Sequence, residues 1–332
     1  MFFETKRPGV VILSETDSNR LILWLILYYY DYYRKHVFLS LGRHSAQLLR
    51  ARIKEGRPSP EFPMCMRFSS LEERMKFYRE EFDLRSVEEW TRIHPSIVFA
   101  VILGRYTHIF PREYARIAKH TVVIDDYGDL ADLREYIMQY RPEGVYYDRN
   151  VYSEREICAI CMKNDSDCWD CDNFRGQELA FDMDVENVEC PLHGDLDQRM
   201  GRNDQMSFCE YDLFTLRENA VDLFDELKTE FKRMRVTYSG RGFHIHVFDD
   251  NAYKMSRKER GELADQIVKN FPIDEWVTEG ESHLIRLPFS LNALVSRIVL
   301  PLEIKELDKF DSVTDRRCIP DFFNAAVTIN RV

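Results

Sequence analysis

The chain has 332 residues, 45% of them hydrophobic, which is enough to bury the core of one large domain or two small ones. Its formal net charge of −11 argues against indiscriminate binding of nucleic acid by bulk charge, although it leaves room for a local basic cleft. No stretch reaches the roughly 18 apolar residues that cross a bilayer, and the apolar run 21–30 lacks the cleavage site of a secretory signal.

Residues 1–60 differ in composition from the rest of the chain. They are rich in tyrosine and basic, with ten Lys or Arg against five Asp or Glu, and they end in the linker-like sequence GRPSP. We therefore predict a separable N-terminal extension over 1–60 and a main domain over 61–332. The alternative for the extension is a start placed too far upstream.

Hydrophobic periodicity and capping residues predict a mixed order of helices and strands after residue 66. Apolar side chains recur at near-helical spacing from 66 to about 95, behind a serine cap. The further predicted helices span 130–140, 213–234 and 256–270, the last with Ser256 and Glu259 as a capping box. The predicted strands or strand ends are 121–125, 145–147, 179–184, 235–238, 277–278 and 284–287. This order indicates an α+β fold.

The predicted strand 179–184 carries two acids at alternate positions, Asp182 and Asp184. Side chains two apart on a strand point to the same face, and carboxylates so placed can hold a divalent metal. The alternating residues of this strand are apolar, so its other face is expected to lie in a core. In phosphoryl chemistry such acids bridge ions that activate an attacking 3′-hydroxyl and neutralise the leaving pyrophosphate. We predict a Mg²⁺ or Mn²⁺ site here, the alternative being two acids on a solvent-exposed face.

The segment 237–247 contains a Ser-Gly-Arg-Gly turn followed by a strand with two histidines. Its glycines allow backbone amides to approach an anion closely, and Arg241 and His244 can reach phosphate oxygens. Together with Ser239 they form a candidate triphosphate site. The alternative is a glycine-bearing hairpin with incidental polar residues, and His246 fits a structural role equally well.

Six of the eight cysteines fall between 158 and 209, which indicates metal ligation in a reducing, cytoplasmic environment rather than a disulfide scaffold. Two Cys-x2-Cys pairs have the spacing of a tetrahedral Zn²⁺ site: Cys158, Cys161, Cys168 and Cys171. A weaker second candidate for zinc, for which a buried structural role is nearly as good an explanation, consists of Cys190, His193 and Cys209.

Two further features could contact a nucleotide or a nucleic acid. Arg286 follows a predicted strand and could pair bidentately with phosphate, although in isolation it is an ordinary strand terminus. Tyr146, Tyr147 and Tyr152 are candidates for stacking on bases or sugars, with core packing as the alternative.

These residues resemble the archaeo-eukaryotic primase family, in its archaeal small catalytic subunit form. The resemblance runs from about Met66 to Leu302, and the paired acids and the SGRGxH turn are specific only in combination. The motifs that carry it are Phe77-Tyr78, Pro111-Arg112-Glu113, Val145-Tyr146-Tyr147, Phe181–Asp184, Ser239–His244 and Arg286-Leu-Pro-x-Ser290.

The resemblance implies a catalytic sheet like that of RNA-recognition domains, flanked by helices, with a zinc knuckle within about 158–210. It implies template-directed synthesis of short primers on single-stranded DNA from nucleoside triphosphates, in complex with a primase large subunit. By position, Asp182 and Asp184 would ligate metal, and the nucleotide's phosphates would be contacted by Ser239, Arg241, His244, Arg286 and Ser290.

Three of the chain's departures from the family pattern concern its sites. A third metal-binding aspartate is usual where this chain has Gly280, so Glu279 and Glu281 become candidate replacements as catalytic acids. The family's zinc ligands normally follow the paired acids, whereas the cleaner cysteine quartet precedes them. Asn292 stands where a histidine is usual.

The leading hypothesis is thus a DNA primase catalytic subunit acting in replication, in the cytoplasm of an archaeal cell. Gly280 keeps open a second hypothesis, a catalytically impaired, zinc-stabilised nucleic-acid-binding subunit. A third is a primase-polymerase of a mobile element or a repair pathway.

Overall fold

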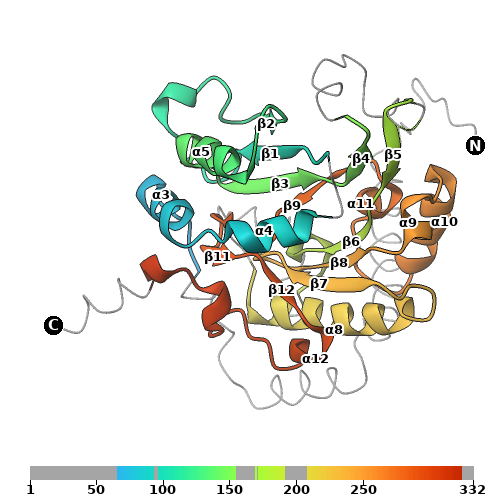
Figure 1. Ribbon diagram of the computed structural model, residues 1–332. Coiled ribbons are helices and arrows are strands. Elements are labelled where there is room, and N and C mark those ends of the chain that lie inside the picture. Colours follow the sequence, from blue (N-terminus) through green and yellow to red (C-terminus); the bar gives the residue numbers. More distant parts are fainter. Residues whose placement is uncertain (1–65, 93–95, 155–168, 170, 191–207, 324–332) are drawn as a thin grey trace, which may run out of the picture.

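The computed structural model describes residues 66–92, 96–154, 169, 171–190 and 208–323 (Figure 1). The predicted extension 1–60 lies outside these residues, as do Cys158, Cys161, Cys168 and His193. Within the described ranges, no helix has both the length and the apolar character needed to span a membrane.

The described residues form helices and strands in mixed order. The α-helices are α3 (Leu71–Glu80), α4 (Leu84–Thr91), α5 (Leu130–Tyr140), α8 (Glu210–Leu227), α9 (Asp250–Tyr253), α10 (Arg257–Ile267), α11 (Glu275–Glu279) and α12 (Ile304–Leu307). The strands are β1 (Phe99–Ile102), β2 (Thr121–Ile124), β3 (Gly144–Asp148), β4 (Asn150–Tyr152), β5 (Phe174–Gln177), β6 (Leu179–Met183), β7 (Met234–Tyr238), β8 (Phe243–Val247), β9 (Leu284–Arg286), β10 (Leu291–Asn292), β11 (Arg297–Ile298) and β12 (Leu300–Leu302). Short 3-10 turns are η1 (Arg112–Tyr114), η3 (Val185–Asn187) and η4 (Arg316–Cys318).

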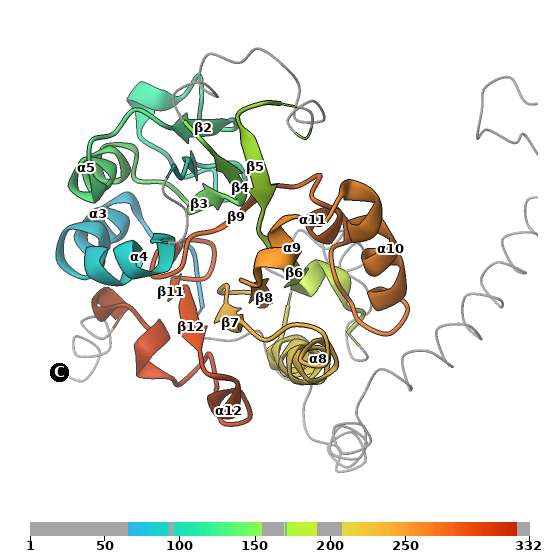
Figure 2. The same cartoon turned by 45° about the vertical axis from the view of Figure 1, so that its right-hand side comes forward.

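Two four-stranded antiparallel sheets organise the molecule (Figures 1 and 2). The first has the order β2-β1-β3-β9, and the second has the order β12-β7-β8-β6. The pairs β10-β11 and β4-β5 form two smaller ribbons. This combination of helices with antiparallel sheets confirms the predicted α+β class.

The second sheet, β12-β7-β8-β6, has one apolar and one polar face. Residues Leu179, Phe181 and Met183 of β6 belong to a hydrophobic cluster with the buried side chains of α8. Alternation along the strand therefore turns Asp182 to the opposite face, where its register partner on β8 is His244. Figure 1 shows α8 lying against this sheet on one side only.

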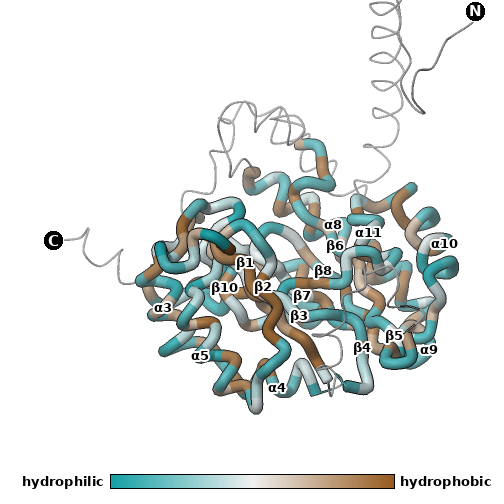
Figure 3. Tube along the Cα trace, turned by 90° about the horizontal axis from the view of Figure 1, so that it is seen from above, coloured by the Kyte–Doolittle hydropathy of each residue, from teal (hydrophilic) through white to brown (hydrophobic). Residues whose placement is uncertain are grey.

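The first sheet, β2-β1-β3-β9, packs against α3, α4 and α5 through a second hydrophobic cluster. All four residues of β1 are buried, and Figure 3 shows the hydrophobic colour concentrated there. Ala180 of β6 and Phe248, which follows β8, also belong to this cluster. The polar face of the second sheet is thus partly covered by the hydrophobic cluster of the first sheet. The end of this face near Asp182 is left for a site.

Two helices begin at the capping residues that the sequence predicts. Ser256 and Glu259 form a reciprocal capping box at α10, and Ser70 and Glu73 form the same motif at α3. The predicted strand end at 277–278 is wrong, because Asp274 caps the short helix α11 there and Thr278 is inside it. The hydroxyl of Thr278 donates to the carbonyl of Ala180 at 3.2 Å, so a β-branched residue is used to fasten this helix to β6.

Candidate active site

The two predicted acids lie at the end of β6 on the face opposite α8. The Oδ1 atom of Asp182 is buried, accepts no hydrogen bond from the described residues and lies 3.3 Å from Nε2 of His244. Burial acts to raise the pKa of Asp182, but the nearby His244 and Arg286 outweigh it, so the pKa is lowered and the group is a carboxylate at neutral pH. Asp184 directly follows the strand and accepts from the amide of Val185 at 2.6 Å.

The Ser-Gly-Arg-Gly turn joins β7 to β8 and touches the end of β6. A Cβ atom at Gly242 would lie 1.9 Å from the carbonyl oxygen of Met183, so only glycine allows this approach. Gly240 adopts a positive φ of 106°, a conformation that glycine tolerates without strain. These two glycines therefore place the turn beside Asp184.

Arg241 projects from this turn over the acids. Its guanidinium lies 2.5 Å from Oε1 of Glu186 and 3.8 Å from Oδ1 of Asp184. Burial and the charge of Asp184 raise the pKa of Glu186 to about 7, although Arg241 partly offsets them. Three carboxyl groups and one arginine thus share a small volume, an arrangement suited to binding cations and polyanions together.

His244 is 4% exposed, and its Nδ1 atom has no hydrogen-bond partner within the described part of the chain. Behind it on the same strand, His246 is fully buried, and its Nδ1 lies 2.7 Å from Oε1 of the fully buried Glu178. The hydroxyl of Tyr147 donates to both oxygens of Glu178 at 3.0 Å. His246 therefore belongs to a buried polar network that supports the site, whereas His244 faces the acids.

The remaining predicted phosphate contacts divide into two kinds. The guanidinium of Arg286 stacks over the ring of Tyr146 at 4.9 Å, and its Nη1 is buried without a hydrogen-bond partner among the residues described. Ser290 is fully buried, and its hydroxyl donates to the carbonyl of Leu287 at 2.6 Å. The side-chain amide of Asn292 donates to the carbonyl of Ser239 at 3.0 Å and so stabilises the Ser-Gly-Arg-Gly turn. Arg286 thus keeps a donor for a ligand, while Ser290 is engaged in its own turn.

Neither Glu279 nor Glu281 is the acid that the structure places near Asp182. Glu281 forms an ion pair with Arg257, and Glu279 is the last residue of α11. Asp274, at the other end of α11, donates its amide hydrogen to the carbonyl of Asp182 at 2.8 Å. Burial and the charge of Asp182 raise the pKa of Asp274.

Gly280 cannot simply be replaced by the acid that the family pattern has there. Its φ is 92°, and a Cβ atom would lie 2.3 Å from Oε1 of Gln177 and 2.9 Å from Cζ2 of Trp169. We expect Gly280→Asp to lower the free energy of unfolding by about 2–4 kcal/mol, from left-handed strain and overpacking, without raising activity.

Urea denaturation measures this loss of stability. The matched control is Gly261→Asp, because Gly261 lies on α10 and a Cβ atom at that position would meet no other atom within 4 Å in the described part of the chain. A Gly280→Asp protein as stable as the control would contradict the packing described for this position.

Cys190 and Cys209 lie together at the start of α8. Their sulfur atoms are 3.7 Å apart, and a carboxylate oxygen of the buried Asp212 lies within 4.8 Å of both. Two thiolates held at about 2.3 Å by one tetrahedral ion are separated by roughly 3.8 Å, whereas a disulfide brings them to about 2.05 Å. The donor set therefore fits zinc. Of the alternative quartet, only Cys171 belongs to the described residues, and it is a free thiol there.

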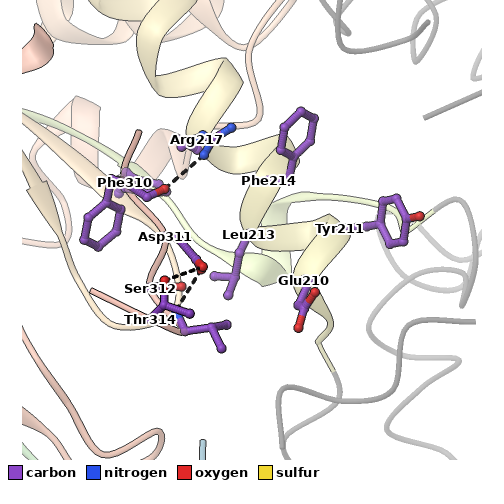
Figure 4. A pocket seen from close by; sticks show the side chains of 11 residues that line it. Glu210, Tyr211, Leu213, Phe214, Arg217, Phe310, Asp311, Ser312 and Thr314 are labelled. Atoms are coloured by element: carbon purple, nitrogen blue, oxygen red, sulfur yellow. Dashed lines mark hydrogen bonds between the residues drawn. The ribbon is translucent and has the colours of Figure 1, made fainter. Parts of the chain in front are cut away.

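A cavity of about 390 Å³ lies elsewhere, between the first turns of α8 and the segment 310–314 (Figure 4). Arg217 lines it and donates to the carbonyl of Phe310 at 2.9 Å. Phe243, the lining residue that comes from the second sheet, belongs to the α8 face, opposite Asp182. This cavity is therefore separate from the acids.

Comparison with known proteins identifies the family. The chain is 53% identical over 252 residues to an "Uncharacterized DNA primase small subunit-like protein" of Archaeoglobus fulgidus, covering 75% of this chain and 90% of that protein. The chain belongs to the family of archaeal DNA primase small subunits. The primase small subunit PriS of Pyrobaculum aerophilum is 26% identical over 55% of this chain and 67% of its own length. That of Pyrococcus furiosus is 27% identical over 59% of this chain, which spans about half, 48%, of the Pyrococcus protein.

Two other comparisons add no argument about the primase site. No family model matches the chain. Among solved structures, the polymerase domain of Mycobacterium tuberculosis Ligase D in complex with DNA aligns with a TM-score of 0.42 and 13% identity, covering 76% of this chain and 89% of that one. The family assignment thus rests on the sequence relatives.

Sequence reasoning missed three acids at these sites. Glu186 lies two residues after Asp184, in a turn whose direction no periodicity reveals. Asp274 is distant in sequence from Asp182 and precedes a segment with the pattern of a strand. Asp212 could have been found, because it stands three residues after Cys209, the spacing of a paired zinc ligand.

Proposed function

We propose that this chain is the catalytic subunit of a DNA primase, which synthesises short primers on single-stranded DNA from nucleoside triphosphates. The observation that carries the proposal is the meeting of Asp182 and Asp184 with Arg241 and His244 at one end of the second sheet. Acids that bind cations and basic groups that bind phosphate are the two parts that nucleotidyl transfer requires.

Asp182 and Asp184 are the residues that would hold Mg²⁺ or Mn²⁺. Their fit rests on the ionised state of Asp182 and on its Oδ1, which is buried and accepts no hydrogen bond from the described residues. When bound, the ions supply activation of the primer's 3′-hydroxyl and neutralisation of the leaving pyrophosphate. Glu186 and Asp274 are two further carboxyl groups whose pKa values the charges of Asp184 and Asp182 raise, and Glu279 and Glu281 remain predicted alternatives for the third acid.

The nucleotide's phosphates would lie between Arg241 and Arg286, with His244 beneath them. Arg241 would exchange its ion pair with Glu186 for the negative charge of the triphosphate, and Arg286 would use its Nη1 donor. Ser239 would contribute through the turn that Asn292 supports, because its carbonyl already accepts from that residue. Ser290 would act by shaping the same pocket.

Zn²⁺ would be held by Cys190 and Cys209 together with Asp212, and the predicted fourth ligand is His193, which lies outside the described residues. This site would fasten the start of α8 to the segment after β6. The quartet Cys158, Cys161, Cys168 and Cys171 remains the alternative zinc site.

The departure at Gly280 supports a second function, that of a nucleic-acid-binding subunit with impaired catalysis. Primer synthesis on single-stranded DNA, with labelled nucleotides and either Mg²⁺ or Mn²⁺, separates the two. Incorporation by the wild-type chain supports the primase. Its absence, even with a primase large subunit added, supports the binding role.

A partner subunit and a location follow from the same proposal. The large primase subunit would assist initiation, and both would act in replication in the cytoplasm, where the crowded thiols between 158 and 209 would stay reduced.

A further inference from the structure

A second cavity, of about 620 Å³, lies where β5 meets the start of α10. We call it the β5–α10 groove. Four basic residues, Arg175, Lys254, Arg257 and Lys258, line it together with the aromatic residues Trp169, Phe174 and Tyr253. None of the described residues that line it is acidic, although the chain as a whole carries a net charge of −11.

The cations of this groove are largely available to a ligand. Within the described part of the chain, Arg175 and Lys254 form no ion pair. Lys258 has Glu262 at 3.5 Å, but both side chains are more than half exposed, so water screens this contact. Arg257 pairs with Glu281 at the rim. Arg257 and Lys258 also begin α10, so their charges add to the positive end of the helix dipole.

Trp169 and Phe174 form an aromatic wall of the groove. The rings of Trp169 and Phe174 lie 5.0 Å apart, and the guanidinium of the fully buried Arg260 stacks on Trp169 at 5.5 Å. Gly176 has a φ of 144°, and a Cβ there would lie 2.5 Å from the carbonyl oxygen of Tyr253, so the strand β5 rests directly on α9. Figure 2 shows β5, α9 and α10 on the same side of the molecule.

The β5–α10 groove lies close to the acids along the chain, because β5 is followed directly by β6. Arg175 and Asp182 are seven positions apart, so their Cα atoms are separated by at most roughly 25 Å. Gly280, next to Trp169, closes the helix α11 whose other end meets Asp182. A chain of phosphates that leaves the acids could therefore reach the groove within a few nucleotides.

We propose that the β5–α10 groove binds single-stranded DNA, with its phosphates on Arg175 and Lys254 and a base against Trp169. Proteins that bind single-stranded nucleic acid combine cations, which attract the phosphates, with aromatic side chains, on which unstacked bases stack. The groove offers both. That this DNA is the template for synthesis at the nearby acids rests on the proposed function.

The test measures the anisotropy of a labelled oligothymidylate of about 16 nucleotides as a function of salt, without metal or nucleotide. For single strands the slope of log K against log salt is about −0.7 per phosphate contact, so Arg175→Ala/Lys254→Ala should reduce the slope by about 1.4. At 0.1 M salt this corresponds to roughly 25-fold weaker binding. The control Lys305→Ala/Lys309→Ala removes two cations at and beside α12 and should leave binding unchanged.

A second measurement tests the base contact. Binding of the oligothymidylate should quench tryptophan fluorescence in the wild type, and Trp169→Phe should lose most of this quenching while keeping the fold. Equal affinity and slope in Arg175→Ala/Lys254→Ala and in the control would overturn the proposal, as would unchanged quenching in Trp169→Phe. A wild-type chain whose DNA binding responds to these substitutions but which makes no primers would refute the proposed function alone.

Discussion

The variant Asp182→Asn/Asp184→Asn is expected to lose template-directed nucleotide incorporation by at least about 10³-fold. The substitution keeps the shape of both side chains but removes the charges that would hold the divalent ions. The stabilisation that such ions give to a phosphoryl-transfer transition state amounts to several kcal/mol, and about 4 kcal/mol corresponds to 10³-fold in rate. Incorporation of labelled nucleotide on single-stranded DNA measures the loss.

The same variant should bind Mn²⁺ more weakly than the wild type, and its two substitutions should have opposing effects on stability. Loss of the Asp184 charge relieves its repulsion of Glu186, whose pKa is raised to about 7 by burial and by that charge, whereas loss of the Asp182 charge removes its attraction to His244 and Arg286. Electron paramagnetic resonance of free Mn²⁺ and thermal unfolding provide these readouts. The matched control is Asp222→Asn/Asp225→Asn, which makes the same charge change on α8, away from the acids. Unaltered Mn²⁺ binding in the site variant would place the ions elsewhere.

Removal of zinc should lower the melting temperature by at least about 10 °C. A structural zinc ion contributes about 10 kcal/mol or more to small domains, and losing even about 6 kcal/mol in a domain of this size gives such a shift. The effect is expected to reach the core, because Cys209 is the N-cap of α8 and Phe208 beside it is buried in the cluster under the second sheet.

Elemental analysis and thermal unfolding of Cys190→Ser/Cys209→Ser check this expectation. The variant should lose its zinc, while Cys318→Ser, a buried cysteine outside both candidate sets, should keep it. Retention of zinc in Cys190→Ser/Cys209→Ser with its loss in Cys171→Ser would instead assign the ion to the quartet 158–171.

The parts of this molecule that local patterns encode could be predicted from the sequence. Alternation along 179–184 predicts that Asp182 and Asp184 share a face, and the observed strand β6 has its apolar residues against α8. The helix predicted over 130–140 is α5, and the capping box at Ser256 begins α10. These features depend on neighbours within a few residues, so periodicity and capping suffice to find them.

The parts of the molecule that depend on long-range packing could not be predicted from the sequence. Asp274 approaches Asp182 because α11 docks on β6, where the buried Arg149 donates to carbonyls of Glu178 and Val277 at 2.7 and 2.6 Å. The spacing of residues along the chain does not encode this docking. The segment 277–278 has strand-forming residues, yet the cap at Asp274 and the contact with β6 make it helical.

The role of the tyrosines predicted to stack on bases or sugars also could not be read from the sequence. Tyr147 and Tyr152 are buried, and their hydroxyls donate to Glu178 and Asp148, so they support the core and its polar network. One aromatic residue that lines the β5–α10 groove beside its cations is Trp169, which lies in a cysteine-rich stretch that suggests only metal binding. Which face an aromatic ring occupies depends on the sheet pairing, because β4 and β5 must first come together.

Template-directed incorporation by the wild-type chain tests the central claim most directly. On an oligothymidylate template with Mg²⁺ or Mn²⁺, the primase account predicts incorporation of adenosine nucleotides only, and on an oligocytidylate template of guanosine nucleotides only. Both activities should disappear in Asp182→Asn/Asp184→Asn. Incorporation that ignores the template, or that survives in this variant, would contradict the account.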